Sequence, residues 1–342
     1  MCLGFVDIKK AFDSANVWGI LLLLQKKVVH PEIINILEHW FSISSAKIKW
    51  NDTLSKSVSL TSGVRQGGIL SPLLFSAFID NILSILQSSN RGCFINKECF
   101  NSFLYADDLL LVSLSVTDLQ DLLNLASDSF CSLGLQINPA KSNCLRVGRR
   151  FKVVCEEILV SGSPLPWVKE AKYLGVYLKS GKSFSCNWST ARRNFYVAVN
   201  GILGALGREP PLNVLLALVK SNCFPLLHYG IASMPLTATE KRNFSFAYGS
   251  VFNKNFKVSN ALVIEQCQYF CYVLPFNALY DYMRFCFLID RFNRGRLVAS
   301  NPVDKPDSEE LALIALKYNF LNTDSKYQIK CKLWKNIEGI LF

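Results

Sequence analysis

The stretch "FLYADDLLLV", residues 103–112, places two adjacent acids, Asp107 and Asp108, between apolar runs. Carboxylates cost free energy to bury unless something pairs with them, so acids in this setting need an explanation. The flanking residues 101–105 and 109–113 predict two short strands, and their connection is short enough only for the tip of a hairpin. An Asp-Asp pair at a hairpin tip is also ordinary turn chemistry. The pair alone therefore leaves two interpretations open, a simple turn and a functional site.

A third acid, Asp7, ends an apolar strand predicted over residues 1–7. A sheet can bring strand ends together, so we expect Asp7 beside the pair although 100 residues separate Asp7 from Asp107. Clustered carboxylates repel one another and have raised pKa values unless a cation joins them. Mg²⁺ takes oxygen ligands, and two such ions can activate an attacking oxygen and neutralise a leaving pyrophosphate. The three acids thus suit nucleotidyl transfer; the alternative is that Asp7 caps the helix after it.

The rest of the chain mixes the two kinds of secondary structure. Period-2 alternation around the turn "NDT" predicts a hairpin over residues 45–61, and Thr117 is expected to cap a helix. Strands mixed with helices indicate an α+β domain over residues 1–180, with helices packed against an antiparallel sheet, and a mostly helical part follows. The expected helices cover residues 17–28, 31–40, 71–86, 117–133, 188–207 and 211–222; further strands are expected at 145–147 and 173–178, and a late loop at 301–310.

Composition narrows the class of protein. Of the 342 residues, 50% are hydrophobic and 18% charged, which is typical of a globular rather than a disordered chain. We find no uninterrupted apolar run near the roughly 18 residues that a membrane span needs, and no signal peptide. The expectation is therefore an intracellular protein, cytoplasmic or nuclear, without a membrane partner. Twelve cysteines contain no Cys-x-x-Cys pair, so neither a zinc site nor a disulfide framework is expected.

The chain is basic, and the excess is uneven. Its formal net charge is +11, and residues 181–342 hold 19 basic and 11 acidic residues, a net of +8. A polyanionic partner such as nucleic acid fits this asymmetry. A basic surface that serves only solubility explains it equally well.

Five segments in a fixed order carry a family resemblance. Residues 1–180 resemble the palm of reverse transcriptases, particularly those of non-LTR (LINE-type) retrotransposons. The "RQGGILSP" and "YLG" elements fit this family rather than other palm-type nucleotidyl transferases. The matching segments are "GFVDIKKAFDSAN" (4–16), "SGVRQGGILSPLLFSAFID" (62–80), "FLYADDLLLV" (103–112), "GLQINPAKSN" (134–143) and "AKYLGVYL" (171–178).

The resemblance implies catalytic roles for the three acids. Asp7 and Asp107 match the residues that ligate two catalytic Mg²⁺ ions, with Mn²⁺ as an alternative ion, and Asp108 completes the acidic box. The implied activity is that of an RNA-directed DNA polymerase. Its partners would be an RNA template, a DNA primer and deoxynucleoside triphosphates.

The other matched positions imply binding roles. The nucleotide-binding residues would be Phe12, Gln66, Gly67 and Lys141: Phe12 matches the steric gate that favours deoxynucleotides, Gln66 and Gly67 match the contact with the templating pair, and Lys141 could approach the triphosphate. A core phenylalanine and a solvated loop lysine are the alternatives for Phe12 and Lys141. The segment Tyr173, Leu174 and Gly175 matches the hairpin that grips the primer end.

The resemblance continues more weakly after the palm. We divide the chain into a palm over 1–182, a thumb-like helical region over 183–240 and a helical, basic region over 241–342. Arg192 and Arg193 would contact the nucleic-acid backbone.

The first matching segment starts at residue 4, whereas the family has a fingers subdomain before it. We therefore expect a truncated fragment with little polymerase activity of its own, because lost positioning groups lower rates strongly. The alternative function is a decayed or domesticated palm that only binds nucleic acid.

Overall fold

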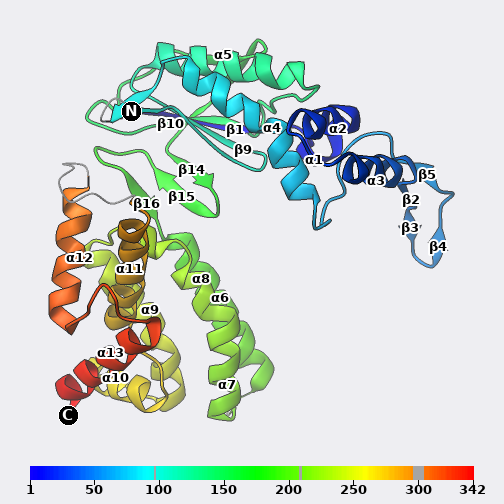
Figure 1. Cartoon of the computed structure of the whole chain (residues 1–342). Coiled ribbons are helices and arrows are strands. Elements are labelled where there is room, and N and C mark those ends of the chain that lie inside the picture. The colour runs from blue at the N-terminus through cyan, green and yellow to red at the C-terminus, as the bar shows by residue number, and fades with distance from the viewer. Residues whose placement is uncertain (96–97, 208–209, 296–303) are drawn as a thin grey trace. The chain divides into compact units, whose positions relative to one another are not determined.

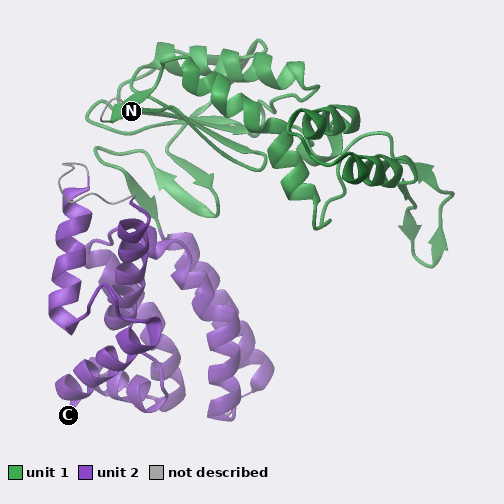
Figure 2. Cartoon of the chain, viewed as in Figure 1, with its two compact units in different colours: residues 1–187 green, residues 188–342 purple. Residues whose placement is uncertain are grey.

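The five-stranded sheet of the first 187 residues has the strand order β13-β10-β1-β9-β8 (Figure 1). The structure is a computed structural model that describes residues 1–95, 98–207, 210–295 and 304–342. It divides into two units, residues 1–187 and 188–342, which are described separately below (Figure 2). The predicted palm boundary lies close to this division, and the further division at residue 240 stays a prediction.

The centre of the sheet is β1 (Cys2–Asp7), with antiparallel partners on both sides. On one side lies β9 (Asp108–Ser113), which pairs with β8 (Ser102–Tyr105) as the predicted hairpin. On the other side lies β10 (Asn143–Arg146), which also pairs in parallel with β13 (Trp167–Val168). The predicted α+β fold is confirmed for this unit, and its sheet is antiparallel as predicted except for the short parallel pair of β10 and β13.

One face of the sheet is covered by two helices, α4 (Ser71–Ser88) and α5 (Val116–Ser132) (Figure 1). Side chains alternate along a strand, so β1 turns Gly4 and Val6 to the helices and Asp7 to the other face. At Gly4 an added Cβ would lie 3.2 Å from a methyl group of Leu119 on α5. Glycine there lets α5 pack closely on the strand, which anchors β1 from behind while its far end carries Asp7.

Short elements complete the first unit. The predicted hairpin over 45–61 is confirmed, with Trp50 and Thr53 paired across the turn. A three-stranded sheet of order β14-β15-β16 precedes the unit boundary. The elements are α1 (Ala11–Ser14), α2 (Val17–Lys26), α3 (Pro31–Ser42), β2 (Ser45–Ala46), β3 (Lys49–Trp50), β4 (Thr53–Leu54), β5 (Val58–Ser59), β6 (Cys93–Ile95), β7 (Glu98–Phe100), β11 (Ile158–Val160), β12 (Ser163–Leu165), β14 (Glu170–Tyr173), β15 (Val176–Lys179) and β16 (Ser185–Asn187).

The second unit is helical throughout its described part. Its helices are α6 (Ser189–Leu206), α7 (Leu212–Leu218), α8 (Phe224–His228), α9 (Ala238–Phe256), α10 (Ala261–Phe270), α11 (Phe276–Asn293), α12 (Lys305–Tyr318) and α13 (Lys326–Leu341). Arg284 of α11 is fully buried and joins α11 to α12. Its guanidinium donates to a carboxylate oxygen of Glu310 at 2.9 Å and forms an ion pair with Asp307.

The helical segment Leu212–Ser233 is long and apolar enough, by length and composition, to cross a membrane. The sequence expectation concerned uninterrupted apolar runs, and Lys220, Ser221 and Asn222 interrupt this one, whereas the mean hydropathy of the whole helical segment is still high enough for a span. Of its most apolar 18-residue window, 39% is buried within the structure, and core helices of soluble proteins pass the same test. The expectation of no membrane partner stays a prediction.

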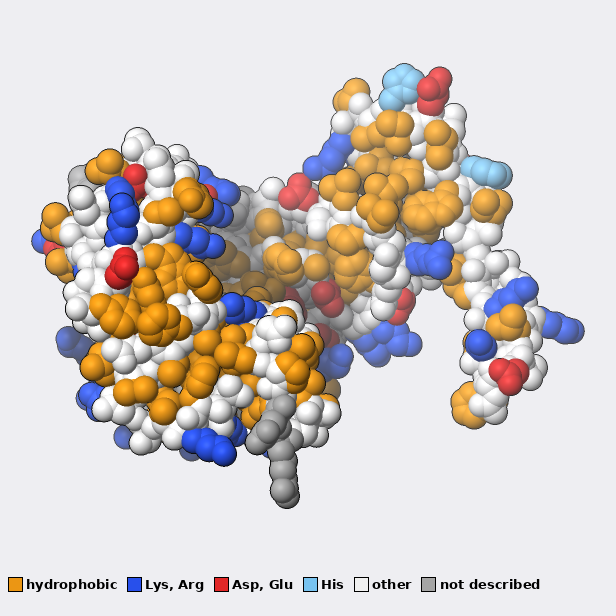
Figure 3. Space-filling view, turned by 90° about the horizontal axis from the view of Figure 1, so that it is seen from below, with side chains coloured by type: hydrophobic (Ala, Val, Ile, Leu, Met, Phe, Trp, Pro, Cys, Tyr) orange, Lys and Arg blue, Asp and Glu red, His pale blue; other side chains and the backbone are white. Residues whose placement is uncertain are grey.

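Hydrophobic side chains also cover much of the visible surface (Figure 3). In the first unit, many of them lie on α2, α3 and the hairpin that follows, among them Trp18, Ile36 and Trp50. The opposite sides of these helices are buried: Ile20, Leu21 and Leu24 of α2 and Leu37 of α3 belong to the same hydrophobic core as Val6.

Three local predictions were wrong. The cap of α5 is Ser115, whose hydroxyl accepts from the Asp118 N–H, and not Thr117. The strand expected at 173–178 is two strands, β14 and β15, because Leu174 and Gly175 take positive φ angles of 45° and 81° and reverse the chain. The late loop expected at 301–310 is helical from Lys305, since Pro306 fits a first helical turn; residues 301–303 lie outside the described residues.

Candidate active site

The turn between β8 and β9 consists of Ala106 and Asp107, flanked by the cross-strand pair Tyr105 and Asp108. Ala106 has a φ of 50°, a left-handed conformation that costs free energy for a residue with a Cβ. A two-residue hairpin loop needs positive φ to match the strand twist. The strained turn fixes Asp107 at the tip and Asp108 at the first position of the strand.

Asp7 and Asp108 are directly opposed across the antiparallel pair of β1 and β9. Opposed residues point to the same face of a sheet with their Cβ atoms about 4.5–5.5 Å apart. Phe5 and Leu110 are the next pair on this face. The register therefore turns both acids away from the helices α4 and α5, and the expectation that the sheet brings these strand ends together is met.

The acids disturb one another electrostatically. The pKa of Asp108 is raised above its ordinary value, first by partial burial, then by the negative charges of Asp107 and Asp7. Lys172 opposes the shift with its positive charge but does not outweigh it. This is the electrostatic signature of an acid cluster that would gain from a bound cation.

Hydrogen bonds hold the loop over residues 138–142 against Asp7. The backbone N–H of Asp7 donates to the Ser142 hydroxyl at 3.0 Å, and the Asn138 amide donates to the Asp7 carboxylate at 3.2 Å. The Lys141 ammonium lies 4.0 Å from the same carboxylate oxygen, on a side chain that is 70% exposed. Lys141 is thus beside the acids and free to turn towards an anion. Sequence reasoning missed Asn138 and Ser142, although both lie in the segment that carries Lys141.

A second hairpin approaches the acids from the three-stranded sheet. Tyr173 ends β14, and Leu174 and Gly175 form the turn to β15, as the primer-grip resemblance implies. The ring of Tyr173 packs on Phe5 with centroids 5.9 Å apart. Burial and the negative charge of Asp108 raise the pKa of the Tyr173 hydroxyl. This turn therefore lies on the same sheet face as the acids.

The other residues predicted to contact the nucleotide lie on α1 and in the loop before α4. Phe12 of α1 is half-buried and stacks on Phe75 of α4, with centroids 4.6 Å apart, so its ring is held in place. Gln66 lies in an exposed loop and donates to the Asp13 carboxylate at 3.2 Å. Next to it, Gly67 has a φ of 80° and no atom within 4 Å of the position that a Cβ would take. The loop thus presents open backbone at Gly67, and its nucleotide contact stays a prediction.

Arg192 and Arg193 lie on α6 in the second unit. Arg193 is exposed and Arg192 half-exposed, so both can meet a phosphate backbone. Their role in binding nucleic acid stays a prediction.

The donor set fits a hard divalent cation. Within the described residues, no group of three or more His, Cys, Asp or Glu side chains is arranged to hold a metal ion alone. Mg²⁺, however, is usually held by one or two carboxylates together with substrate phosphates. Asp7 and Asp108 provide two opposed carboxylates, and Asp107 adds a third acid at the tip.

Comparison with known proteins gives a consistent result. Residues 1–178, just over half of the chain, match the family model described as reverse transcriptase (RNA-dependent DNA polymerase). A retrovirus-related Pol polyprotein from the type-1 retrotransposable element R2 of Nasonia vitripennis is 30% identical over 191 residues, covering 52% of this chain and 18% of that protein. The RNA-directed DNA polymerase from the mobile element jockey of Drosophila funebris is 25% identical over 243 residues, covering 67% of this chain and 26% of that protein. The matched part of this chain thus spans only about a fifth to a quarter of these relatives.

A solved structure of telomerase from Candida albicans, in complex with a fragment of telomeric RNA, is 12% identical with a TM-score of 0.37. The match covers 95% of this chain and 51% of the telomerase chain. At this TM-score it supports no inference about the arrangement of the two units.

Proposed function

Since this chain belongs to the reverse transcriptase (RNA-dependent DNA polymerase) family and its relatives are non-LTR retrotransposon polymerases, we propose that it extends a DNA primer on an RNA template. The observation that carries the proposal is the opposed pair Asp7 and Asp108 with Asp107 at the adjacent turn. Three carboxylates lie together where β1 ends and β9 begins, with a lysine beside them. This arrangement suits the transfer of a nucleotide from a triphosphate.

The acids and the residues next to them would have different roles in the reaction. Reverse transcriptases depend on divalent metal ions, which when bound lower the pKa of the primer hydroxyl and neutralise the leaving pyrophosphate. Asp7, Asp107 and Asp108 would hold the cations, and Asn138 keeps the Asp7 carboxylate oriented through its hydrogen bond. Lys141 would place a positive charge near the triphosphate.

The sheet and the second hairpin would position the substrates. β1 and β9 hold the carboxylates rigidly, because their other faces are anchored under α5. The turn at Leu174 and Gly175 would hold the primer end against the acids, with Tyr173 half-buried near Asp108. Phe12, fixed by its stacking on Phe75, would exclude the 2′-hydroxyl of a ribonucleotide.

A primer-extension assay tests the proposal. The native chain, with poly(rA) template, oligo(dT) primer, dTTP and Mg²⁺, should incorporate dTMP above the background measured without protein, however slowly, and Asp107→Ala should abolish this incorporation. Asp80→Asn is the matched control: Asp80 is exposed on α4, pairs with Lys27 at 3.1 Å and should leave the rate unchanged. Incorporation that survives Asp107→Ala, or RNA binding without any incorporation, would favour a palm that only binds nucleic acid.

A further inference from the structure

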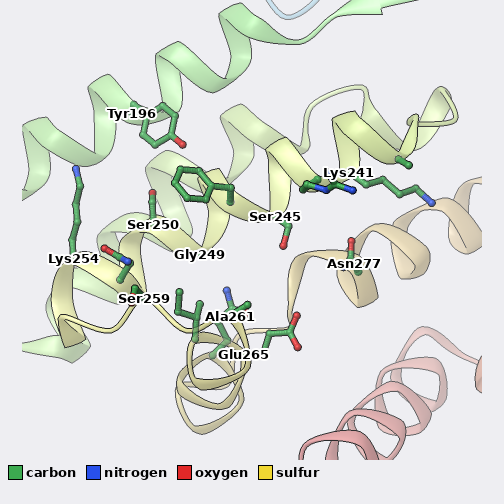
Figure 4. Close-up of a pocket in the computed structure, with 16 residues that line it drawn as sticks. Tyr196, Lys241, Ser245, Gly249, Ser250, Lys254, Ser259, Ala261, Glu265 and Asn277 are labelled. Atoms are coloured by element: carbon green, nitrogen blue, oxygen red, sulfur yellow. The ribbon is translucent and has the colours of Figure 1, made fainter.

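A pocket of about 740 Å³ lies within the second unit between α6, α9, α10 and α11 (Figure 4). α9 provides one wall with side chains at helical spacing, and Tyr196 of α6 points its hydroxyl into the space from the opposite side. Gly249 of α9 lets α10 come close, since an added Cβ would lie 3.2 Å from Ile264. The size is in the range of pockets that enclose a small organic ligand. None of the roles proposed above uses this pocket.

Gln268 of α10 lines the pocket and is only 3% exposed. Within the part of the chain that the structure describes, its side-chain amide has no hydrogen-bond partner. The amide is not fully enclosed: among the described side chains, the enclosed polar atoms without a hydrogen-bond partner are Asn143 Oδ1 and His228 Nε2. The Gln268 amide therefore stays accessible from the pocket as a donor and an acceptor. A ligand that donates to and accepts from the amide would satisfy both of its polar atoms.

Positive charge surrounds this amide. Lys241 and Asn277 lie at one end of the pocket and Lys254 at the other (Figure 4). Lys241 is held over the Tyr280 ring at 4.6 Å, and Lys254 donates to the Asn200 amide oxygen at 2.7 Å. Arg242, in contrast, is exposed and has no ion pair within the described residues. It is the cation that is most available to an anionic ligand.

One carboxyl group and two aromatic rings complete the lining. Glu265 is partly buried, and burial raises its pKa, so its carboxyl holds a proton more readily and repels a negatively charged ligand less than an ordinary carboxylate would. Phe246 is 76% exposed on the pocket wall and offers a ring face, as does Tyr196. The pocket thus combines a ring for stacking, an unpaired amide and a free cation. A nucleobase with its phosphate has all three matching parts: an aromatic face, a polar edge and a negative charge.

We propose that the pocket between α9 and α10 binds one unpaired nucleotide of a single-stranded nucleic acid. The base would stack on Phe246 and exchange hydrogen bonds with Gln268, while Arg242 would pair with the phosphate. The inference extends the proposed function, because it gives the helical unit a site for template or primer strand beyond the palm. It does not need catalysis, so it is tested without primer extension.

Photo-cross-linking locates the bound strand. The full chain is irradiated with a single-stranded RNA of about 12 nucleotides that carries 4-thiouracil, and cross-linked peptides are mapped by mass spectrometry. We expect cross-links within residues 238–268 of the native chain. Gln268→Leu should reduce their yield about tenfold, the effect of losing one good amide–base contact. A DNA of the same sequence with 4-thiothymine distinguishes an RNA from a DNA ligand, and specific cross-linking of either strand supports the pocket.

Each variant is expected to change a different set of measured properties. Gln268→Leu roughly keeps the side-chain volume and removes an amide that bonds to no described residue, so its Tm should stay unchanged while cross-linking falls. Arg242→Gln should lower RNA affinity and reduce the salt slope of binding by about one. Gln266→Leu is the matched control on the same helix, because Gln266 bonds to the Leu341 carbonyl and does not line the pocket.

The result that overturns the proposal is also specific. It would be cross-linking confined to residues 1–187, or a yield within 238–268 that Gln268→Leu leaves unchanged or that Gln266→Leu lowers equally. Cross-links to residues 1–187 serve as the internal reference. Their loss would count against nucleic-acid binding by the palm, whereas a loss within 238–268 alone concerns only the pocket.

Discussion

Asp108→Asn should stabilise the chain when no metal is present. Asp108 opposes Asp7 directly in the sheet, and like charges in that position destabilise a fold by roughly 0.2–1 kcal/mol. Asparagine keeps the shape and removes one of the two charges. For a unit of 187 residues, 1 kcal/mol corresponds to about 2–4 °C in Tm. We therefore expect the variant to melt up to a few degrees higher in EDTA at pH 7.

In the presence of Mg²⁺, the native chain should instead have a higher Tm than Asp108→Asn. A cation that binds only the folded state at ten times its Kd adds about 1.4 kcal/mol of stability. The native chain should gain this amount, and Asp108→Asn, which lacks one ligand, should gain much less. The assay is thermal unfolding followed by intrinsic fluorescence, with and without Mg²⁺.

The pH dependence follows from the raised pKa of Asp108. Below its ordinary pKa of 3.8 the carboxyl is protonated in the folded and unfolded states, so the repulsion is absent. As pH rises through the raised folded pKa, the native chain loses stability relative to Asp108→Asn. The difference between the two should therefore vanish in acid.

A control separates this effect from a general loss of charge. Asp128 is exposed on α5 and forms no hydrogen bond or ion pair within the described residues, so Asp128→Asn should change neither the Tm nor the response to Mg²⁺. The reasoning is refuted if Asp108→Asn lowers the Tm in EDTA, or if Mg²⁺ stabilises the variant as much as the native chain.

Three further predictions concern other parts of the chain. Burial lowers the pKa of His228 to about 4, so protonation should cost the folded state roughly 3 kcal/mol between pH 7 and 4. His228→Phe should remove this acid sensitivity in urea unfolding, and equal sensitivity of both chains would contradict it. Arg284→Met leaves the carboxylates of Asp307 and Glu310 without their buried cation and should lower the free energy of unfolding by roughly 3 kcal/mol, measured by urea denaturation; a loss well below 1 kcal/mol would refute this. Phe12→Val should raise ribonucleotide relative to deoxynucleotide incorporation about tenfold in primer extension, and an unchanged ratio would leave Phe12 as a core residue.

Much of the first unit is predictable because its elements carry local signals. The strand that ends at Asp7, the hairpin around Asp107 and the helix α4 all follow from apolar periodicity and turn residues. The pairing of β10 with β1 is not predictable in this way, because both strands are short and more than a hundred residues separate them in the chain. The parallel strand β13 has only two residues and leaves no periodic pattern.

The site is predictable in its residue types but not in its register. The order of the motifs identifies the acids, yet only the sheet shows that Asp7 opposes Asp108 while Asp107 lies in the turn. The hydrogen bonds from Asn138 and to Ser142 depend on how a loop folds back over 130 residues later, which no local pattern encodes. In the sequence, the division between the palm and the helical unit is visible mainly because the second half of the chain carries more net positive charge than the first.

The central claim is that the opposed acids form one cation site, and Mn²⁺ binding tests it without turnover. The measurement is electron paramagnetic resonance of free Mn²⁺, titrated with the full chain together with a primer–template whose primer lacks its 3′-hydroxyl and the matching triphosphate. We predict that the native chain removes Mn²⁺ from solution beyond what the nucleic acid and triphosphate bind, and that Asp7→Asn loses this excess. Equal Mn²⁺ uptake by the native chain and Asp7→Asn would contradict the account.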